Sequence, residues 1–156
     1  MIQVLFVCLG NICRSPMAEA VFRKKVKEAG LQNKIQVDSA GTGNWHTGKR
    51  PHEGTITILE KNKINHSGIT ARQVEESDLQ AFDYIVAMDA ENIGVLRSVA
   101  GHERTGDMSR LLDYLPDSDV ADVPDPYFTG NFSEVYDLVE KSCTHLLAYI
   151  KEKHQL

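Results

Sequence analysis

Residues 2–16 read Ile2-Gln3-Val4-Leu5-Phe6-Val7-Cys8-Leu9-Gly10-Asn11-Ile12-Cys13-Arg14-Ser15-Pro16. The run from Ile2 to Val7 is apolar except for Gln3, which is typical of a central strand of a parallel sheet, buried on both faces. An amphipathic segment follows Pro16, so the predicted order is strand, short loop, helix. This order favours an α/β fold in which the loop lies beyond the carboxyl end of the first strand.

The loop between this strand and helix combines residue types that suit an anion-binding site. The start of a helix presents unpaired backbone N–H groups and the positive end of the helix dipole. Gly10 permits close approach of the backbone to a ligand, and Arg14 carries a planar fork of donors that matches two phosphate oxygens. Ser15 suits the N-cap of the helix and Pro16 its first position. We therefore expect a phosphate-binding loop.

Cys8 is predicted to lie at the base of this loop. Convergent N–H groups and the Arg14 guanidinium favour the thiolate over the thiol. A thiolate beneath a bound phosphate is a nucleophile directed at phosphorus, so the loop indicates covalent catalysis. The alternative is a buried cysteine at a strand end beside a surface arginine. The preceding strand, Gly10 and the Ser15-Pro16 helix start disfavour that alternative.

The bulk composition excludes several classes of protein. The chain of 156 residues is long enough for one domain with a substantial core, and its 42% hydrophobic and 25% charged residues are ordinary for a globular protein. The net charge of −5 argues against a general nucleic-acid binder, so any anion affinity must be local. No apolar run approaches about 18 residues, so we expect no membrane span. Three cysteines, an odd number, predict no disulfide framework and a cytoplasmic location.

Predicted strands and helices alternate along the chain. Strands are expected at residues 2–8, 35–40, 82–88 and 108–114, and helices at 16–29, 51–62, 90–99 and 133–153, with a short helical turn at 76–81. Such alternation predicts a single domain, residues 1–156, with a doubly wound, four-stranded parallel sheet and helices on both faces. Cys8, the 39–45 segment and Asp89 all follow strands, so they are expected to meet at one edge of the sheet.

A phosphocysteine route also needs a carboxyl group that protonates the leaving oxygen and then activates water. The acidic loop at residues 115–132 and its flank offer Asp113, Asp117, Asp119, Asp122 and Asp125. Composition does not choose among these carboxylates. Two prolines, Pro124 and Pro126, hold Asp125 in an extended, stiff backbone, which favours Asp125 as the positioned group.

Two motifs resemble the low-molecular-weight protein tyrosine phosphatase family, in its bacterial type. They are Cys8-Leu9-Gly10-Asn11-Ile12-Cys13-Arg14-Ser15-Pro16 and Asp125-Pro126-Tyr127. The resemblance covers the whole chain and includes Asp38-Ser39-Ala40-Gly41-Thr42, Ala71-Arg72-Gln73 and Ala87-Met88-Asp89. It implies a hydrolase that removes phosphate from protein phosphotyrosine through a phosphocysteine intermediate, with no metal or other cofactor.

The resemblance implies a role for each matching residue. Cys8 corresponds to the nucleophile, Arg14 to the phosphate-binding arginine, and Asp125 to the general acid and later base. Ser15 corresponds to the hydroxyl that hydrogen-bonds the nucleophilic sulfur, and Asn11 to an asparagine that holds the loop in shape. The predicted substrate-binding set is Leu9, Gly10, Asn11, Ile12, Cys13, Ser15, Trp45, Tyr127 and Phe128, of which the last three correspond to aromatic walls of the entrance.

The remaining implied roles concern support and redox chemistry. Ser39 and Asp89 are expected to support the site. Cys13 corresponds to a cysteine that forms a reversible disulfide with the nucleophile, so a redox-sensitive enzyme is expected. The chain departs from the family at Ile69, where many relatives carry a histidine that contacts the loop asparagine. What supports Asn11 here is therefore an open question.

Three other functions fit the first loop. An arginine phosphatase is the nearest, but those relatives favour a small threonine at the place of Ile12. An arsenate reductase would need a further relay cysteine, and only Cys143, inside the last helix, remains. A phosphotyrosine-binding module would not need Cys8.

The expected partners follow from the same resemblance. They are tyrosine-phosphorylated proteins, with no nucleic acid, and the chain is expected to be a monomer or a weak dimer. The histidines His46, His52 and His66 are irregularly spaced, which predicts no metal site.

Overall fold

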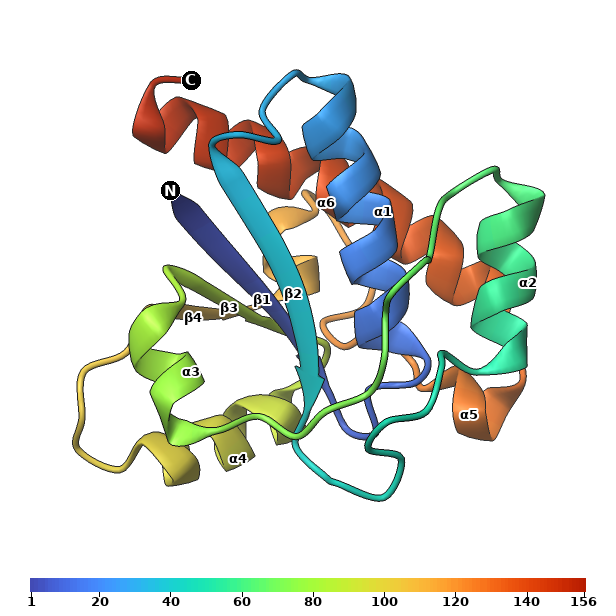
Figure 1. Cartoon of the computed structure of the whole chain (residues 1–156), viewed down its shortest axis with the longest axis horizontal. Helices are drawn as coiled ribbons and strands as arrows, with labels where there is room; N and C mark the ends of the chain where they lie inside the picture. The colour runs from blue at the N-terminus through green and yellow to red at the C-terminus, as the bar shows by residue number, and fades with distance from the viewer.

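The computed structural model describes all 156 residues and has a four-stranded sheet at its centre (Figure 1). The strands are β1 (Ile2–Cys8), β2 (Ile35–Gly41), β3 (Tyr84–Ala87) and β4 (Asp107–Arg110). All neighbouring pairs are parallel, in the order β2-β1-β3-β4. The predicted four-stranded parallel sheet is confirmed, with the most apolar strand, β1, between two neighbours.

The alternation of side chains along β1 explains why this strand is central. Val4, Phe6 and Cys8 belong to one apolar core, whereas Leu5 and Val7 belong to the core on the opposite face. Since successive side chains of a strand point to opposite faces, an apolar run without alternation must be buried on both sides.

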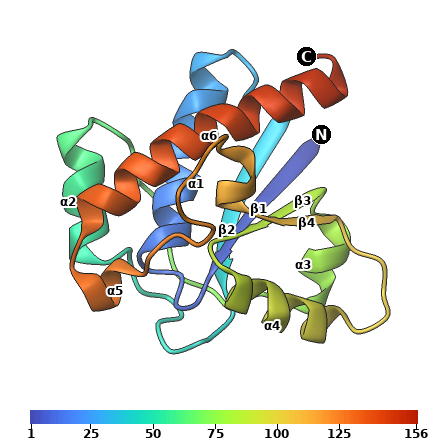
Figure 2. The same ribbon diagram turned by 180° about the vertical axis from the view of Figure 1, so that it is seen from behind.

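Helices cover both faces of the sheet, as predicted (Figures 1 and 2). On one side lie α1 (Arg14–Glu28), α2 (Glu53–Lys61) and α6 (Phe132–His154), and on the other α3 (Glu76–Ala81) and α4 (Ala90–Ala100). Two shorter elements, the 3₁₀ helix η1 (Leu111–Tyr114) and α5 (Pro126–Thr129), precede α6. The rings of Phe6 on β1 and Phe22 on α1 meet edge to face at 5.5 Å, which fixes α1 against the sheet.

Several predicted boundaries are wrong. Helix α1 begins at Arg14 rather than at residue 16, so Ser15 is not its N-cap; the N-cap residue is Cys13, and Ser15 uses its hydroxyl elsewhere. Strand β3 is shorter than 82–88. The strand predicted at 108–114 ends at Arg110, because Asp113 accepts the Arg110 backbone N–H and turns the chain into η1. The acidic loop contains α5, which was not predicted.

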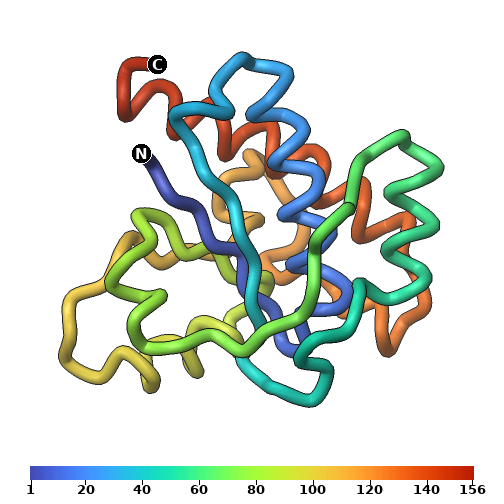
Figure 3. Tube along the Cα trace, in the orientation of Figure 1, coloured from blue at the N-terminus to red at the C-terminus, as the bar shows by residue number.

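The carboxyl ends of the strands face one end of the molecule. The connections that follow β1 and β2 lie side by side there, and both chain termini lie toward the opposite end (Figure 3). No helix has both the length and the apolar composition to span a bilayer. The fold therefore brings the loop after Cys8 and the loop after Gly41 together, which is where a ligand binds on such sheets.

Candidate active site

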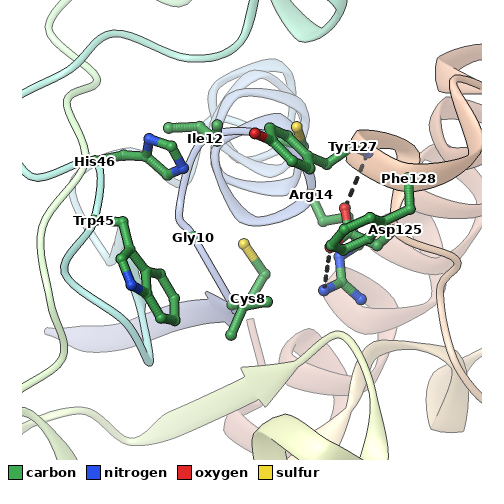
Figure 4. Close-up of a pocket in the computed structure, with 11 residues that line it drawn as sticks. Cys8, Gly10, Ile12, Arg14, Trp45, His46, Asp125, Tyr127 and Phe128 are labelled. Carbon is green, nitrogen blue, oxygen red and sulfur yellow. Dashed lines mark hydrogen bonds and ion pairs between the residues drawn. The ribbon is translucent and has the colours of Figure 1, made fainter.

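A cavity opens where the first loop leaves β1 (Figure 4). Trp45 and His46 stand on one side of the cavity, and Tyr127 and Phe128 stand on the other, with Cys8 between them. The lining residues are Cys8, Leu9, Gly10, Ile12, Cys13, Arg14, Trp45, His46, Asp125, Tyr127 and Phe128. The space between these residues is about 370 Å³, with open solvent at the mouth included.

The backbone of the loop leaves a set of N–H groups without protein partners. Asn11 has a φ of 56°, in the left-handed region that asparagine tolerates, and the loop curls there around the Cys8 sulfur. The N–H groups that donate to no protein acceptor are those of Leu9, Gly10, Ile12, Cys13 and Arg14. Helix α1 starts at Arg14, so its positive end adds to the same field. This arrangement can bind an anion with several oxygens.

The Cys8 sulfur is buried and surrounded by hydrogen-bond donors. The residue is 2% exposed. Its Sγ lies 3.3 Å from the Asn11 N and 3.5 Å from the Ser15 N, both of which donate to it, and 2.9 Å from the Ser15 Oγ. Three hydrogen-bonding groups therefore converge on the one sulfur at the floor of the cavity.

The guanidinium of Arg14 is held rigidly beside the loop. It donates to Asp89 Oδ2 at 2.7 Å, to the Val123 carbonyl at 2.9 Å and to Asp125 Oδ2 at 3.4 Å. Burial lowers the pKa of Arg14, but the negative charges of Cys8 and the neighbouring carboxylates outweigh burial and raise the pKa above its ordinary value. The cation is therefore permanent and oriented before any ligand arrives.

Asp125 reaches the cavity from the start of α5. Its backbone is extended, with φ −87° and ψ 109°, and Pro126 follows it at the first helical position. One carboxylate oxygen accepts the Tyr127 N–H at 3.1 Å, and the other faces Arg14 (Figure 4). The two flanking prolines thus position the one aspartate of the acidic loop that lines the cavity.

Asn11 is supported by the backbone of Arg72, which answers the question that Ile69 raised. Asn11 Oδ1 accepts the Arg72 N–H at 3.0 Å, and its Nδ2 donates to Ser15 Oγ at 2.7 Å and to Ser39 Oγ at 3.0 Å. Ile69 is buried and packs in the apolar core instead. The Arg72 side chain is anchored by carboxylates of β2 and α3, so its N–H is held in place.

The predicted site residues separate into two groups. The backbone loop, Arg14, Asp125 and the three aromatic residues line the cavity, whereas Asn11 and Ser15 do not and lie buried behind it. Asp89 caps α4 by accepting the Asn92 N–H at 2.8 Å and holds Arg14 with its other oxygen. Ser39 lies behind the loop as part of the contacts to Asn11.

Sequence patterns did not reveal His46 as a residue that lines the cavity. His52 is not a lining residue; its ring lies 6.1 Å from that of Tyr127 and stacks on Phe132 at 5.1 Å. The one feature of the sequence that could have indicated His46 as a site residue is its place next to Trp45. Two aromatic side chains at the mouth of the cavity are unusually exposed for apolar residues: 66% of Trp45 and 75% of Phe128 are accessible to solvent. Such exposure is typical of a surface that contacts a partner.

The other two cysteines are in very different places. Cys13 lines the cavity, and burial, followed by the charges of Cys8 and Asp125, raises its pKa to about 12, so it is a thiol at neutral pH. Cys143 is fully buried in the core between α6 and the sheet, where burial raises its pKa. It does not line the cavity.

Comparison with known proteins gives one consistent family. The model of the family "Low molecular weight phosphotyrosine protein phosphatase" matches residues 3–156. The chain is 62% identical to the low molecular weight protein-tyrosine-phosphatase YfkJ of Bacillus subtilis over 156 residues, the full length of both chains. It is 47% identical to PtpA of Staphylococcus aureus, a protein with the same description, over 96% of this chain and 94% of that one.

Solved structures agree with the sequence comparison. The crystal structure of YfkJ superimposes with a TM-score of 0.96 at 61% identity, covering 98% of this chain and 96% of that one. The structure titled Drosophila arginine phosphatase, DARP, superimposes with a TM-score of 0.88 at 32% identity, covering 96% of this chain and 98% of that one.

Proposed function

The chain belongs to the low molecular weight phosphotyrosine protein phosphatase family, and from that membership we propose that it hydrolyses phosphotyrosine in proteins through a phosphocysteine intermediate. The prediction of a phosphatase is confirmed at the level of the family. The observation that carries the finer proposal is that five residues with unpaired N–H groups, among them Arg14 with its guanidinium, line the same cavity as Cys8.

In the first step, the Cys8 thiolate attacks phosphorus. The N–H groups and Arg14 hold the three non-bridging oxygens, where negative charge is spread in the transition state. The bond from phosphorus to the tyrosine oxygen breaks, and the Asp125 carboxyl gives its proton to that leaving oxygen. Asp125 lines the same cavity and is already aligned by its contacts with Arg14 and the Tyr127 N–H.

In the second step, water replaces the sulfur. Asp125, now a carboxylate, takes a proton from the water as it attacks phosphorus, and the phosphorus–sulfur bond breaks. Inorganic phosphate leaves and Cys8 returns to the thiolate. The Ser15 hydroxyl at 2.9 Å can donate to the sulfur and so stabilise it as a leaving group.

The shape of the cavity favours phosphotyrosine over phosphoserine. Trp45 and Tyr127 stand on opposite sides of the cavity, and Cys8 lies between them (Figure 4). A flat aromatic ring that fills this slot brings its phosphate to the sulfur, whereas the short side chain of phosphoserine leaves the aromatic surfaces without a partner.

Arginine phosphatase is the second candidate activity, since a relative with the same fold carries that description. Ile12 lines the cavity and packs against Cys13 and Ala71, so an apolar side chain stands beside the loop. A guanidinium leaving group would have unpaired N–H donors against Ile12. This contact favours tyrosine.

Steady-state hydrolysis of phosphotyrosine, phosphoserine and phosphoarginine by the reduced, metal-free protein tests the proposal. We expect kcat/KM for phosphotyrosine to exceed the other two by at least about 100-fold, because pocket contacts of this kind set selectivity of that order. Faster hydrolysis of phosphoarginine would replace the proposal with the arginine activity. Tight binding of phosphotyrosine without turnover would indicate a binding module.

The same assay with arsenate tests the reductase alternative. Cys143 is buried in the core and does not line the cavity that Cys8 and Cys13 share, so we expect no thiol-dependent turnover of arsenate. Turnover that is lost in Cys143→Ser would contradict this expectation.

Cys13 is proposed to protect the nucleophile from oxidation. Peroxide converts the Cys8 thiolate to a sulfenic acid, and the Cys13 thiol then forms a disulfide with it and releases water. Both cysteines line the same cavity. We expect thiol to restore most of the activity of the peroxide-treated wild type but only a minor part in Cys13→Ser, whose sulfenic acid proceeds to irreversible states.

The matched control for this measurement is Cys143→Ser, which removes a thiol from the core rather than from the cavity. We expect recovery of activity in Cys143→Ser to equal that of the wild type. Equal recovery in Cys13→Ser and the wild type would show that no protective disulfide forms.

A further inference from the structure

One buried carboxylate takes no part in the proposed chemistry. Glu19 lies on α1 with only 4% of its surface exposed. Its Oε1 accepts the Ser39 hydroxyl at 2.7 Å, and its Oε2 pairs with Arg23, a half-exposed residue one turn later on the same helix. Burial raises the pKa of Glu19, and the Ser39 hydrogen bond and the Arg23 charge oppose this effect. Asp38 is the other charged group that acts on it.

Glu19 stands at the end of a chain of hydrogen bonds that reaches the nucleophile. The links are Glu19 Oε1 to Ser39 Oγ at 2.7 Å, Ser39 Oγ to Asn11 Nδ2 at 3.0 Å, Asn11 Nδ2 to Ser15 Oγ at 2.7 Å, and Ser15 Oγ to Cys8 Sγ at 2.9 Å. All five residues are buried. Water therefore does not compete for these groups, and each must find its partner within the chain.

The direction of every link follows from one backbone group. The Arg72 N–H can only donate, so the Asn11 atom that it meets must be the carbonyl oxygen. The Asn11 NH₂ group then donates to both Ser15 and Ser39. Each hydroxyl, having accepted from Asn11, must direct its own proton elsewhere. The Ser39 proton points to the Glu19 carboxylate, and the Ser15 proton is free to point to the Cys8 sulfur.

We propose that Glu19 is a positioning residue: as the terminal acceptor of the chain Ser39–Asn11–Ser15, it keeps the Ser15 hydroxyl donating to the Cys8 sulfur. Without an acceptor at position 19, the buried Ser39 proton has no partner, and the serine must turn to find one. Asn11 then loses one of its two acceptors and its fixed orientation. Ser15 can in turn redirect its proton to the Ala40 carbonyl, 3.5 Å from its Oγ.

The catalytic consequence of this proposal rests on the proposed function, but its first test measures only the reactivity of the Cys8 sulfur. The variant is Glu19→Met, which keeps the length of the side chain and removes the acceptor. The readout is the rate of alkylation of Cys8 by iodoacetamide between pH 4 and 9, which reports the thiolate. We expect the pH of half-maximal rate to rise by roughly one unit, because one donor to the thiolate is lost. Cys13 does not interfere, since its pKa of about 12 keeps it protonated.

Two further variants distinguish the loss of a hydrogen-bond acceptor at position 19 from a disturbance of the packing of α1. Glu19→Gln keeps a carbonyl oxygen for Ser39, so we expect its alkylation midpoint to stay within about 0.3 pH units of the wild type. Glu28→Met is the matched control, an exposed glutamate of the same helix with no hydrogen bond or ion pair from its side chain. It is expected to leave the midpoint and the turnover unchanged.

A third variant tests whether Glu19 acts through Ser39. Ser39→Ala is expected to raise the midpoint by a similar amount, and the double variant Glu19→Met/Ser39→Ala by no more than the larger single effect, because both break one chain. Additive shifts would contradict action through Ser39. Ser39→Ala also keeps the proposal open to refutation if Glu19→Met does not fold.

The kinetic readout is expected to follow the alkylation. With phosphotyrosine at a pH at least about one unit below the alkylation midpoint of the wild type, kcat should fall about tenfold in Glu19→Met with little change in KM, since one pH unit is a factor of ten in thiolate below the midpoint. A lower melting temperature with an unchanged alkylation profile would show that Glu19 only stabilises the fold and would overturn the proposal. Absence of phosphatase activity in the wild type would reject the proposed function and leave the alkylation test intact.

Discussion

Replacement of Cys8 by serine is expected to reduce turnover of phosphotyrosine by at least about 10⁴-fold, the order seen when a covalent nucleophile is removed. The hydroxyl has the same place and nearly the same size, but it carries no negative charge at neutral pH. The N–H groups and Arg14 would still hold the phosphate, so binding should survive while the phosphorus–sulfur bond cannot form. Steady-state kinetics and calorimetric titration with inorganic phosphate measure the two properties separately.

The structure predicts that the Cys8→Ser variant folds. The sulfur accepts two backbone N–H groups and contacts the Ser15 hydroxyl, and an oxygen can replace it in each of these contacts. Circular dichroism and the melting temperature are the controls for an intact fold. The Cys143→Ser variant, with its thiol in the core, should retain turnover. Turnover above 10% of the wild type in Cys8→Ser would exclude Cys8 as the nucleophile.

Asp125→Asn is the second prediction with a large expected effect. Asparagine caps a helix as well as aspartate does, so the hydrogen bond from the Tyr127 N–H that begins α5 should remain. What is lost is the proton for the leaving oxygen. We expect kcat/KM for phenyl phosphate, which reports only the transfer of phosphate to Cys8, to fall by roughly 10²- to 10³-fold, within the range for general acid catalysis, and kcat/KM for 4-nitrophenyl phosphate much less.

The dependence on the leaving group is the decisive measurement. A series of aryl phosphates should show a steeper decline of kcat/KM with leaving-group basicity in Asp125→Asn than in the wild type. Asp119→Asn is the matched control, because Asp119 lies in the same acidic loop, is exposed and makes no side-chain hydrogen bond or ion pair. Equal losses for good and poor leaving groups would remove Asp125 from the role of acid.

Much of the fold could be predicted because its signals are local. An apolar strand, a glycine-containing loop and an amphipathic helix occur within the first 29 residues, and strands and helices then alternate. These patterns predicted the parallel sheet with helices on both faces, which the structure has. Boundaries were less predictable at the sheet edge. There a contact between Arg110 and Asp113 ended β4 early, and residue preferences alone do not reveal such a contact.

The sequence by itself determined that a strand, a loop and a helix start are contiguous, and so which loop is the candidate anion site and which cysteine lies at its base. Only the tertiary structure decided what surrounds that sulfur. Asp125, His46, Ser39 and Glu19 reach the site from other elements, and their approach depends on how β2, α1 and α5 pack together. Ser15 shows the limit of local rules. Its sequence position favours an N-cap, yet its hydroxyl meets the Cys8 sulfur and Asn11, because buried polar groups take the partners that packing brings to them.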